Sequence, residues 1–327
     1  MSNGSLGSWS TSNASWEDIG AENGTDLLTP QDGFDHGSLP YRIANILISV
    51  SILLISIFGL MGNGTVIWFL GFCMKRNPFT TFILHLAAAD LGTLICLIFF
   101  AIVSLLWSFS LLPWYVYNLF MSFGTIPLLF MYNTGQYLLI AISMDRCVSV
   151  VFPLWHRCHR PPYFSTLVCV SIWIISFLFT AIDIFTPYTD FYQFLMNAIL
   201  CLPLMTLSTM VLFIKVYFRS QKWKKGKALT AILLALLVFL FLAFPFTCIL
   251  LICFFTPVTD YNVQSVAISV GLLCSCLNSS INPLIYFLIG RNKRAQSRES
   301  MKVILQRLFK EEENCREKRE VPVQTQM

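Results

Sequence analysis

Asn282-Pro283-Leu284-Ile285-Tyr286 lies near the end of the last long apolar stretch of the chain, just before a basic segment. A proline inside a helix removes one backbone hydrogen bond, and inside lipid the freed carbonyl needs another polar partner. Asn282 stands beside that break and can supply the partner, and Tyr286 lies about one turn further along the same face. The sequence therefore predicts a weakened, polar helix segment within a membrane, suited to conformational change.

The composition of the chain excludes a soluble globular protein. Of its 327 residues, 56% are hydrophobic and only 12% are charged, whereas about 25% are charged in soluble domains. A membrane-spanning helix needs about 20 mostly apolar residues. The chain contains seven such segments: 43–72, 80–106, 115–144, 164–184, 194–218, 228–255 and 263–289. We therefore predict an all-α membrane protein, with a bundle of seven transmembrane helices that forms one domain over residues 43–290.

Basic residues mark one side of the predicted bundle. Lys and Arg follow the first, third, fifth and seventh segments, and the opposite loops contain almost none. Because cytoplasmic loops carry the excess of Lys and Arg, we predict that residues 1–42 are extracellular and residues 291–327 cytoplasmic. The net charge of +5 then reflects contact with anionic membrane lipids, not with nucleic acid.

The two ends of the chain have different predicted roles. Residues 1–42 are rich in Ser, Gly, Asn and acids, which predicts a disordered tail. In that tail Asn3, Asn13 and Asn23 each begin a glycosylation sequon. Within 291–309, apolar residues recur at helical spacing opposite basic ones. This pattern predicts a short amphipathic helix on the inner leaflet after the seventh span.

Two other function classes fit the sequence less well. The predicted spans are too apolar to line a pore, and no internal repeat indicates a transporter built from two related halves. An enzyme would need paired acids, a histidine cluster or a nucleophile with its base. His156, Cys158 and His159 lie together but lack a fourth metal ligand. We therefore expect no enzymatic activity, no metal and no cofactor, and a small-solute transporter or channel is the remote alternative.

Two short motifs at the ends of different spans indicate a receptor. Asp145-Arg146-Cys147 ends the third span, and the Asn-Pro-x-x-Tyr motif at 282–286 ends the seventh. This combination resembles the rhodopsin-like G-protein-coupled receptors, whose arginine meets a Gα subunit once it is released from the neighbouring acid. The resemblance implies coupling to a heterotrimeric G protein through five residues: Asp145, Arg146, Asn282, Pro283 and Tyr286. An arginine that only reaches lipid phosphates is the alternative.

Asp90 lies in the second span, where a carboxylate is costly and needs a reason. It resembles the buried acid of these receptors, which faces the first and seventh spans and often binds sodium in the inactive state. The resemblance implies a buried polar, sodium-like site made of Asn63, Asp90, Asn278, Ser279 and Asn282. Gly135 replaces the hydroxyl that often completes the sodium shell. A hydrogen-bonded, purely structural Asp90 is the alternative.

Longer segments narrow the resemblance to the Mas-related receptors. They lie between about Gly59 and Phe309, at 75–80, 84–87, 132–135, 141–143, 145–147, 150–155, 157–161 and 280–287. Three features depart from most rhodopsin-like receptors. The predicted outer loops contain no cysteine for the usual disulfide, Ala243 replaces a deep tryptophan, and Val211 replaces the fifth-span tyrosine.

The expected ligand follows from two acids. Members of the cationic-ligand type carry one acid near the outer end of the fourth helix and another at the start of the fifth. Asp183 occupies the first position and Asp190 lies close to the second. Carboxylates suit a Lys- or Arg-bearing ligand, and aromatic rings can stack on its cation.

The predicted ligand-binding set is Asp183, Asp190, Tyr188, Phe191, Tyr192, Leu128 and Tyr132. Leu128 stands where amine receptors hold an acid, so a monoamine is not expected. We predict an extracellular cationic peptide or amphiphilic amine. The alternatives are a neutral or lipid-like ligand, or an orphan receptor with constitutive activity, in which Asp183 caps a helix and Asp190 is an ordinary loop acid.

Overall fold

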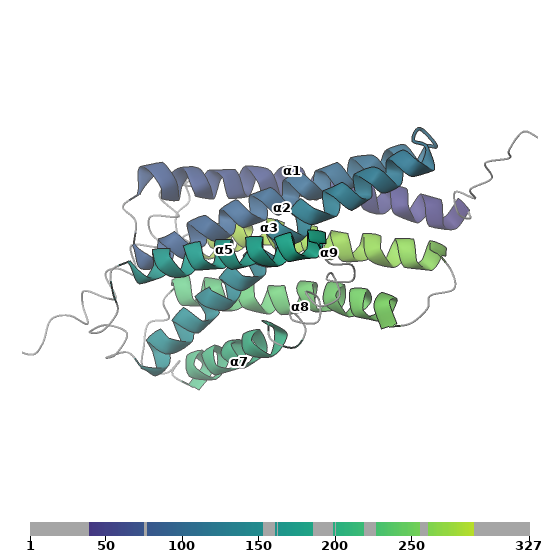
Figure 1. Cartoon of the computed structure of the whole chain (residues 1–327). Helices are drawn as coiled ribbons and strands as arrows, with labels where there is room; N and C mark the ends of the chain where they lie inside the picture. Colours follow the sequence, from purple (N-terminus) through teal and green to yellow (C-terminus); the bar gives the residue numbers. More distant parts are fainter. Residues whose placement is uncertain are drawn as a thin grey trace, which may run out of the picture. The chain divides into compact units, whose positions relative to one another are not determined.

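The computed structural model describes residues 39–74, 77–152, 161, 163–185, 199, 201–218, 227–255 and 261–290. Within these residues the chain forms seven α-helices and no strand (Figure 1). The helices are α1 (Leu39–Trp68), α2 (Pro78–Ser108), α3 (Trp114–Val151), α5 (Phe164–Phe185), α7 (Leu202–Phe218), α8 (Lys227–Phe255) and α9 (Tyr261–Gly290). A short π-helix, η1 (Phe69–Cys73), extends α1.

The predicted all-α, seven-span fold is confirmed. Five helices are long and apolar enough to cross a membrane, namely α1 with η1, α2, α3, α5 and α9. Helices α7 and α8 contain shorter apolar stretches, Leu202–Ile214 and Leu233–Ile249. Helix α3 continues to Val151, past the predicted end at 144. The apolar run ends at Asp145, but helical hydrogen bonding depends on the backbone and continues through charged residues.

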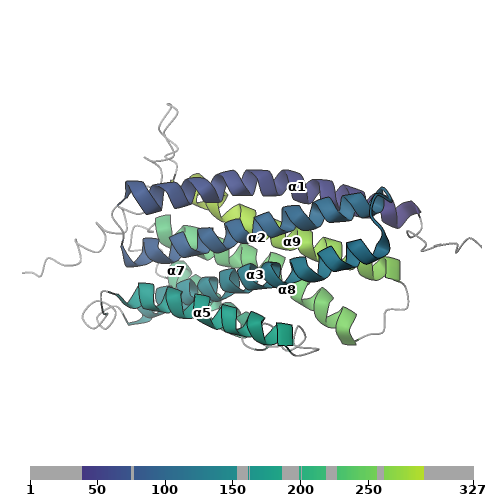
Figure 2. The same cartoon turned by 45° about the horizontal axis from the view of Figure 1, so that its top comes forward.

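The helices pack so that each contacts its neighbours along the chain or in space. Helix α1 packs against α2 and α9, α9 against α8, and α8 against α7 (Figures 1 and 2). Helix α3 contacts α2, α5, α7 and α8. Because α3 contacts four helices, movement of α3 changes its packing against all four.

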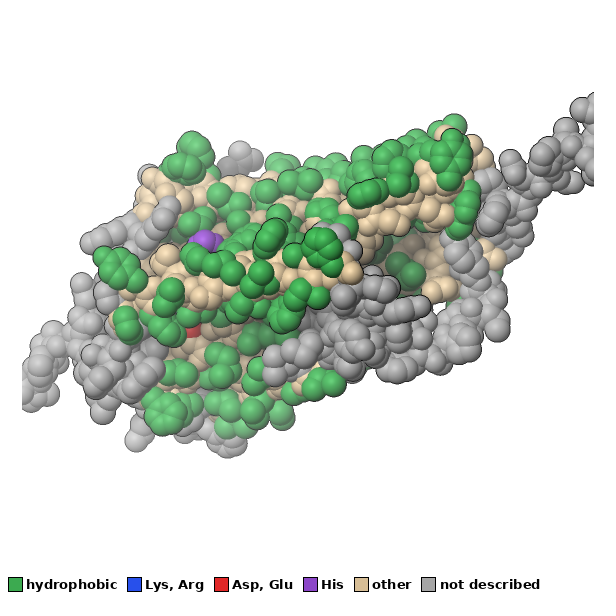
Figure 3. All heavy atoms as spheres, viewed as in Figure 1, with side chains coloured by type: hydrophobic (Ala, Val, Ile, Leu, Met, Phe, Trp, Pro, Cys, Tyr) green, Lys and Arg blue, Asp and Glu red, His purple; other side chains and the backbone are tan. Residues whose placement is uncertain are grey.

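Side chains are sorted as expected for a bundle in lipid. Large apolar residues cover the outward faces, among them Phe58, Phe72 and Phe241, which are 73–78% exposed (Figure 3). Polar residues such as Asn63 and Asp90 are buried between the helices. Polar side chains inside a membrane face the bundle interior, where they find partners. The polar interior of this bundle is therefore the place to look for its function.

Candidate functional site

A polar site lies where α1, α2 and α9 meet. Asn282 Nδ2 donates a 2.8 Å hydrogen bond to Asp90 Oδ2, which joins α9 to α2. All five residues expected in this site are buried: Asn63, Asp90, Asn278, Ser279 and Asn282. The structure therefore gathers the predicted residues from three helices.

Pro283 explains one contact of this site. Lacking an N–H, it leaves the carbonyl of Ser279, four residues earlier, without its helical partner. Asn63 Nδ2 donates to that carbonyl at 3.0 Å and to the Gly59 carbonyl at 3.0 Å. The expectation that Asn282 would compensate the proline is therefore wrong. The partner comes from α1, because the Asn282 amide is engaged by the Asp90 carboxylate.

Gly135 of α3 faces the carboxylate of Asp90. A Cβ built on this glycine would lie 3.8 Å from Asp90 Oδ1, an ordinary van der Waals contact. Helix α3 thus supplies no side-chain oxygen at this point. Within the described ranges no group of three or more His, Cys, Asp or Glu could hold a metal ion, so any cation here would rely on Asp90 and neutral oxygens.

Asp145 and Arg146 lie near the C-terminal end of α3. Arg146 Nε is 3.6 Å from Asp145 Oδ2, and both side chains are largely shielded, at 11% and 5% exposure. The guanidinium carbon of Arg146 also lies 4.0 Å from the ring centroid of Phe79 on α2. Arg146 is therefore held inside the bundle by an acid of its own helix and an aromatic face of another.

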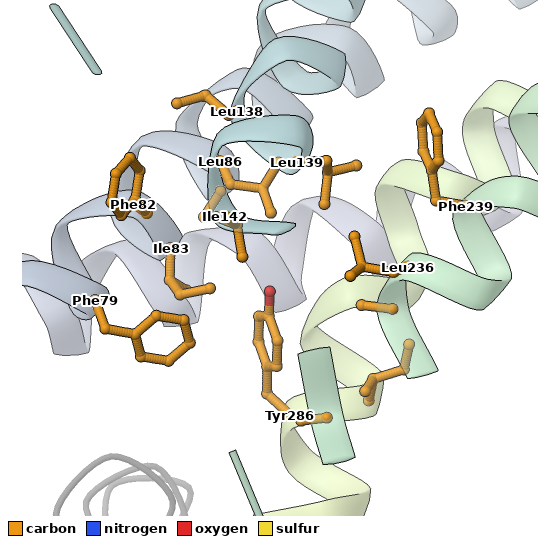
Figure 4. Close-up of a cluster of buried hydrophobic side chains, with 14 of the residues drawn as sticks. Phe79, Phe82, Ile83, Leu86, Leu138, Leu139, Ile142, Leu236, Phe239 and Tyr286 are labelled. Atoms are coloured by element: carbon orange, nitrogen blue, oxygen red, sulfur yellow. The ribbon is translucent and has the colours of Figure 1, made fainter. Parts of the chain in front are cut away.

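Tyr286 lies near this end of the bundle, in an apolar cluster to which all seven described helices contribute. Figure 4 shows its hydroxyl pointing from α9 toward Ile142 of α3. The same cluster contains Phe79 and Ile83 of α2. Three of the five motif residues are thus associated with α2: Arg146 contacts Phe79, Asn282 bonds Asp90, and Tyr286 shares a cluster with Phe79.

A polar contact between α3 and α7 was not predicted. The hydroxyls of Ser143 and Ser208 are hydrogen-bonded to each other, and Cys147 Sγ donates to the Ser208 carbonyl at 3.1 Å. Val211, which replaces the family tyrosine, lies one turn away on α7 and has no polar atom in its side chain. In the sequence, Ser143 and Cys147 are small polar residues four positions apart, which places them on one face of α3 and could have indicated this contact.

The predicted ligand region is only partly described. Leu128 and Tyr132 are buried one turn apart on α3, next to a helix-interior proline, Pro127. Asp183 belongs to α5, but its side chain is outside the described residues. The other predicted features that lie outside the described residues are Tyr188, Asp190, Phe191, Tyr192, the side chain of Ala243, the sequons at Asn3, Asn13 and Asn23, and the amphipathic helix after Gly290.

Comparison with known proteins identifies relatives over most of the chain. Residues 62–218 match the 7 transmembrane receptor (rhodopsin family). The chain is 36% identical to Proto-oncogene Mas of Homo sapiens over 282 residues, covering 80% of this chain and 82% of that protein. It is 36% identical to Mas-related G-protein coupled receptor member H of Rattus norvegicus over 276 residues, covering 81% and 83%.

A third relative extends the match. Mas-related G-protein coupled receptor member X1 of Homo sapiens is 33% identical over 298 residues, which cover 87% of this chain and 89% of that protein. The resemblance predicted from the motifs is thereby confirmed. The chain belongs to the Mas-related G-protein-coupled receptors of the rhodopsin family, which are multi-pass plasma-membrane receptors and not enzymes.

Proposed function

We propose that this receptor binds an extracellular cationic peptide or amphiphilic amine and activates a heterotrimeric G protein at the Arg146 end of its bundle. One observation supports the second part of this proposal, the activation of a G protein, which we call the transduction half. Arg146 is largely buried between Asp145 and the Phe79 ring. A guanidinium held in this way becomes available to a Gα segment only after its surroundings rearrange. A ligand that favours the rearranged state would therefore switch on coupling.

The buried polar site gives a route from the ligand side to Arg146. The Asp90–Asn282 hydrogen bond ties α2 to α9 about one turn before Tyr286. Breaking this bond would free α9 near Tyr286 to move relative to α2. Tyr286 lies in the same apolar cluster as Phe79. We assign Asn63, Asp90, Asn278, Ser279 and Asn282 to the inactive state, with sodium as their candidate occupant.

The ligand half rests on sequence position. Asp183 and Asp190 are two carboxylates near the proposed outer boundary of the membrane, and Tyr188, Phe191 and Tyr192 supply rings for a cation. Leu128 and Tyr132 are buried side chains of α3, and neither carries a negative charge. The charge of a cationic ligand would therefore be recognised by other residues. In this proposal residues 1–42 form the glycosylated extracellular tail, and residues 291–327 lie in the cytoplasm with a helix on membrane lipids.

The transduction half is tested with Arg146→Ala. Nucleotide exchange on a purified heterotrimer should fall at least about tenfold, since the group proposed to meet Gα is gone. The matched control is Arg42→Ala at the start of α1, which should signal normally at equal surface expression. Full signalling from Arg146→Ala would overturn the assignment. Ion currents in the same cells, without nucleotide exchange, would point instead to a channel.

The buried site is tested with Asp90→Asn, which keeps the side-chain shape and removes the charge. Basal exchange or agonist affinity should change and any sodium dependence should disappear, with surface expression preserved. An unchanged dose–response curve with unchanged sodium sensitivity would reduce Asp90 to a packing role.

The ligand half is tested with Asp183→Asn and two agonists found by screening cationic and neutral compounds with a promiscuous Gα and a calcium readout. Breaking a partly desolvated charge pair from one side costs about 2–5 kcal/mol. The potency of the cationic agonist should therefore fall roughly thirty-fold or more, and that of the neutral agonist should barely change. Equal, small shifts for the two would favour a neutral or lipid-like ligand.

A further inference from the structure

The Phe79 ring is placed to hold the cation of Arg146. The guanidinium carbon lies 4.0 Å from the ring centroid, well within the distance of about 6 Å over which a cation is attracted to an aromatic face. Phe79 is 5% exposed and the Arg146 side chain 11%. Because little water competes at such a contact, the attraction is stronger than at an exposed site.

Helix α2 fixes the position of this ring. Phe79 lies in the first turn of the helix, directly after Pro78, whose locked φ angle favours a helix start. The turn is closed by a capping box, in which Thr80 N donates to Asn77 Oδ1 at 2.7 Å and Asn77 N donates to Thr80 Oγ1 at 2.9 Å. The backbone that carries the ring is therefore anchored at the start of α2.

The charge pattern of the neighbouring helices makes this contact important. The sequences of α7, α8 and α9 contain no Asp or Glu. Those helices therefore offer Arg146 no carboxylate, and the acid next to it is Asp145 of its own helix. The Phe79 ring is a restraint of another kind, and it ties Arg146 to a different helix, α2.

We propose that Phe79 is a positioning residue that retains Arg146 in the silent state of the receptor, and that activation requires Arg146 to leave the ring. This inference rests on the proposed function of Arg146 in G-protein activation. The ring stabilises the silent state and makes no contact with Gα in the proposal. Its loss should therefore raise the fraction of active receptor in the absence of any ligand.

The test compares Phe79→Leu, which keeps apolar bulk but lacks an aromatic face, with Phe79→Tyr, which retains the face. Agonist-independent nucleotide exchange is measured on full-length receptor in lipid nanodiscs with a purified heterotrimer. Phe79→Leu should raise basal exchange roughly three- to ten-fold, and Phe79→Tyr should stay near the unmodified receptor. Phe79→Met serves as a second variant without a ring, in case the leucine protein fails to reach the membrane.

The matched control is Phe82→Leu. Phe82 is fully buried about one turn further along α2, in the same apolar cluster, so its substitution reports lost packing. An equal basal rise from Phe79→Leu and Phe82→Leu, or a rise from Phe79→Tyr, would overturn the inference. If Arg146→Ala abolishes exchange but Phe79→Leu leaves basal exchange unchanged, the inference alone fails. If Arg146→Ala signals fully, the proposed function fails and this inference falls with it.

Discussion

Helices α1 and α9 are joined by polar contacts along most of their shared length, whereas the polar contact between α3 and α7 is local. The α1–α9 contacts include Asn45 to Ser265 at 3.2 Å, Ser269 to Asn45 at 3.0 Å, Ser56 to Cys276 at 3.2 Å, Ser280 to the Ile55 carbonyl at 3.4 Å, and Asn63 to the Ser279 carbonyl at 3.0 Å. Among the side chains that the structure describes, the α3–α7 contact includes Ser143, Cys147 and Ser208. We call the α1–α9 interface the frame, because many bonds hold it together. We call the α3–α7 contact of Ser143, Cys147 and Ser208 the latch.

Small residues make the difference between the two pairs possible. Gly59 and Gly62 let the α1 backbone approach Ser280 and Pro283 of α9 closely, and short polar side chains can then bond across the interface. The latch lies next to Arg146, because Cys147 follows it in the chain. A receptor that must move one part against another loses fewer bonds by releasing α7 from α3 than by separating α1 from α9.

The largest expected effect is on the frame. In Gly59→Ala the new Cβ would meet Ser280 and lie 2.7 Å from Leu94 Cδ1, so neighbouring atoms must shift. Overpacking of this kind costs about 1–3 kcal/mol, and the melting temperature of the purified receptor should fall by several degrees. Gly64→Ala on the same helix is the control, because its Cβ would meet nothing within 4 Å. Equal melting temperatures for the two variants would show that the approach at Gly59 is not tight.

The next effect concerns the latch. Ser208→Ala removes a buried hydroxyl that bonds Ser143 and the Met205 carbonyl. A lost hydrogen bond of this kind is worth about 0.5–1.5 kcal/mol, so basal exchange should rise roughly two- to ten-fold if the bond favours the silent state. The control is Thr206→Ala on the same helix, since the exposed Thr206 hydroxyl bonds carbonyls of its own helix at 2.9 Å. A fall in melting temperature without a change in exchange would show that the α3–α7 contact stabilises the fold but does not control activation.

The sequence predicted some of this arrangement and missed the rest for physical reasons. Apolar run length predicts spans, because lipid demands about 20 apolar residues wherever they lie. Asp90 was found because an acid in lipid is rare. The partner of Pro283 was missed because a freed carbonyl can be satisfied from any adjacent helix, and only three-dimensional packing selects Asn63. The contact of Phe79 with Arg146 could not be predicted, because one phenylalanine among 29 carries no sign of its partner in the sequence.

The smallest expected effect is at the other end of the frame. Asn45 is partly buried and bonds both Ser265 and Ser269. Interhelical hydrogen bonds in membrane proteins average about 0.6 kcal/mol, so Asn45→Ala should lower the melting temperature by only a few degrees. Ser51→Ala is the control, because the Ser51 hydroxyl bonds the Leu47 carbonyl of its own helix.

Basal exchange should separate this variant from the latch variant. In Asn45→Ala the contacts of Ser56, Asn63 and Ser280 still join α1 to α9, so the frame stays closed and exchange should remain at the level of the unmodified receptor. Ser208→Ala should lower the melting temperature by a similar amount, but it should also raise basal exchange. If Asn45→Ala raises basal exchange as much as Ser208→Ala, α1 and α9 also move on activation, and the division between frame and latch is wrong.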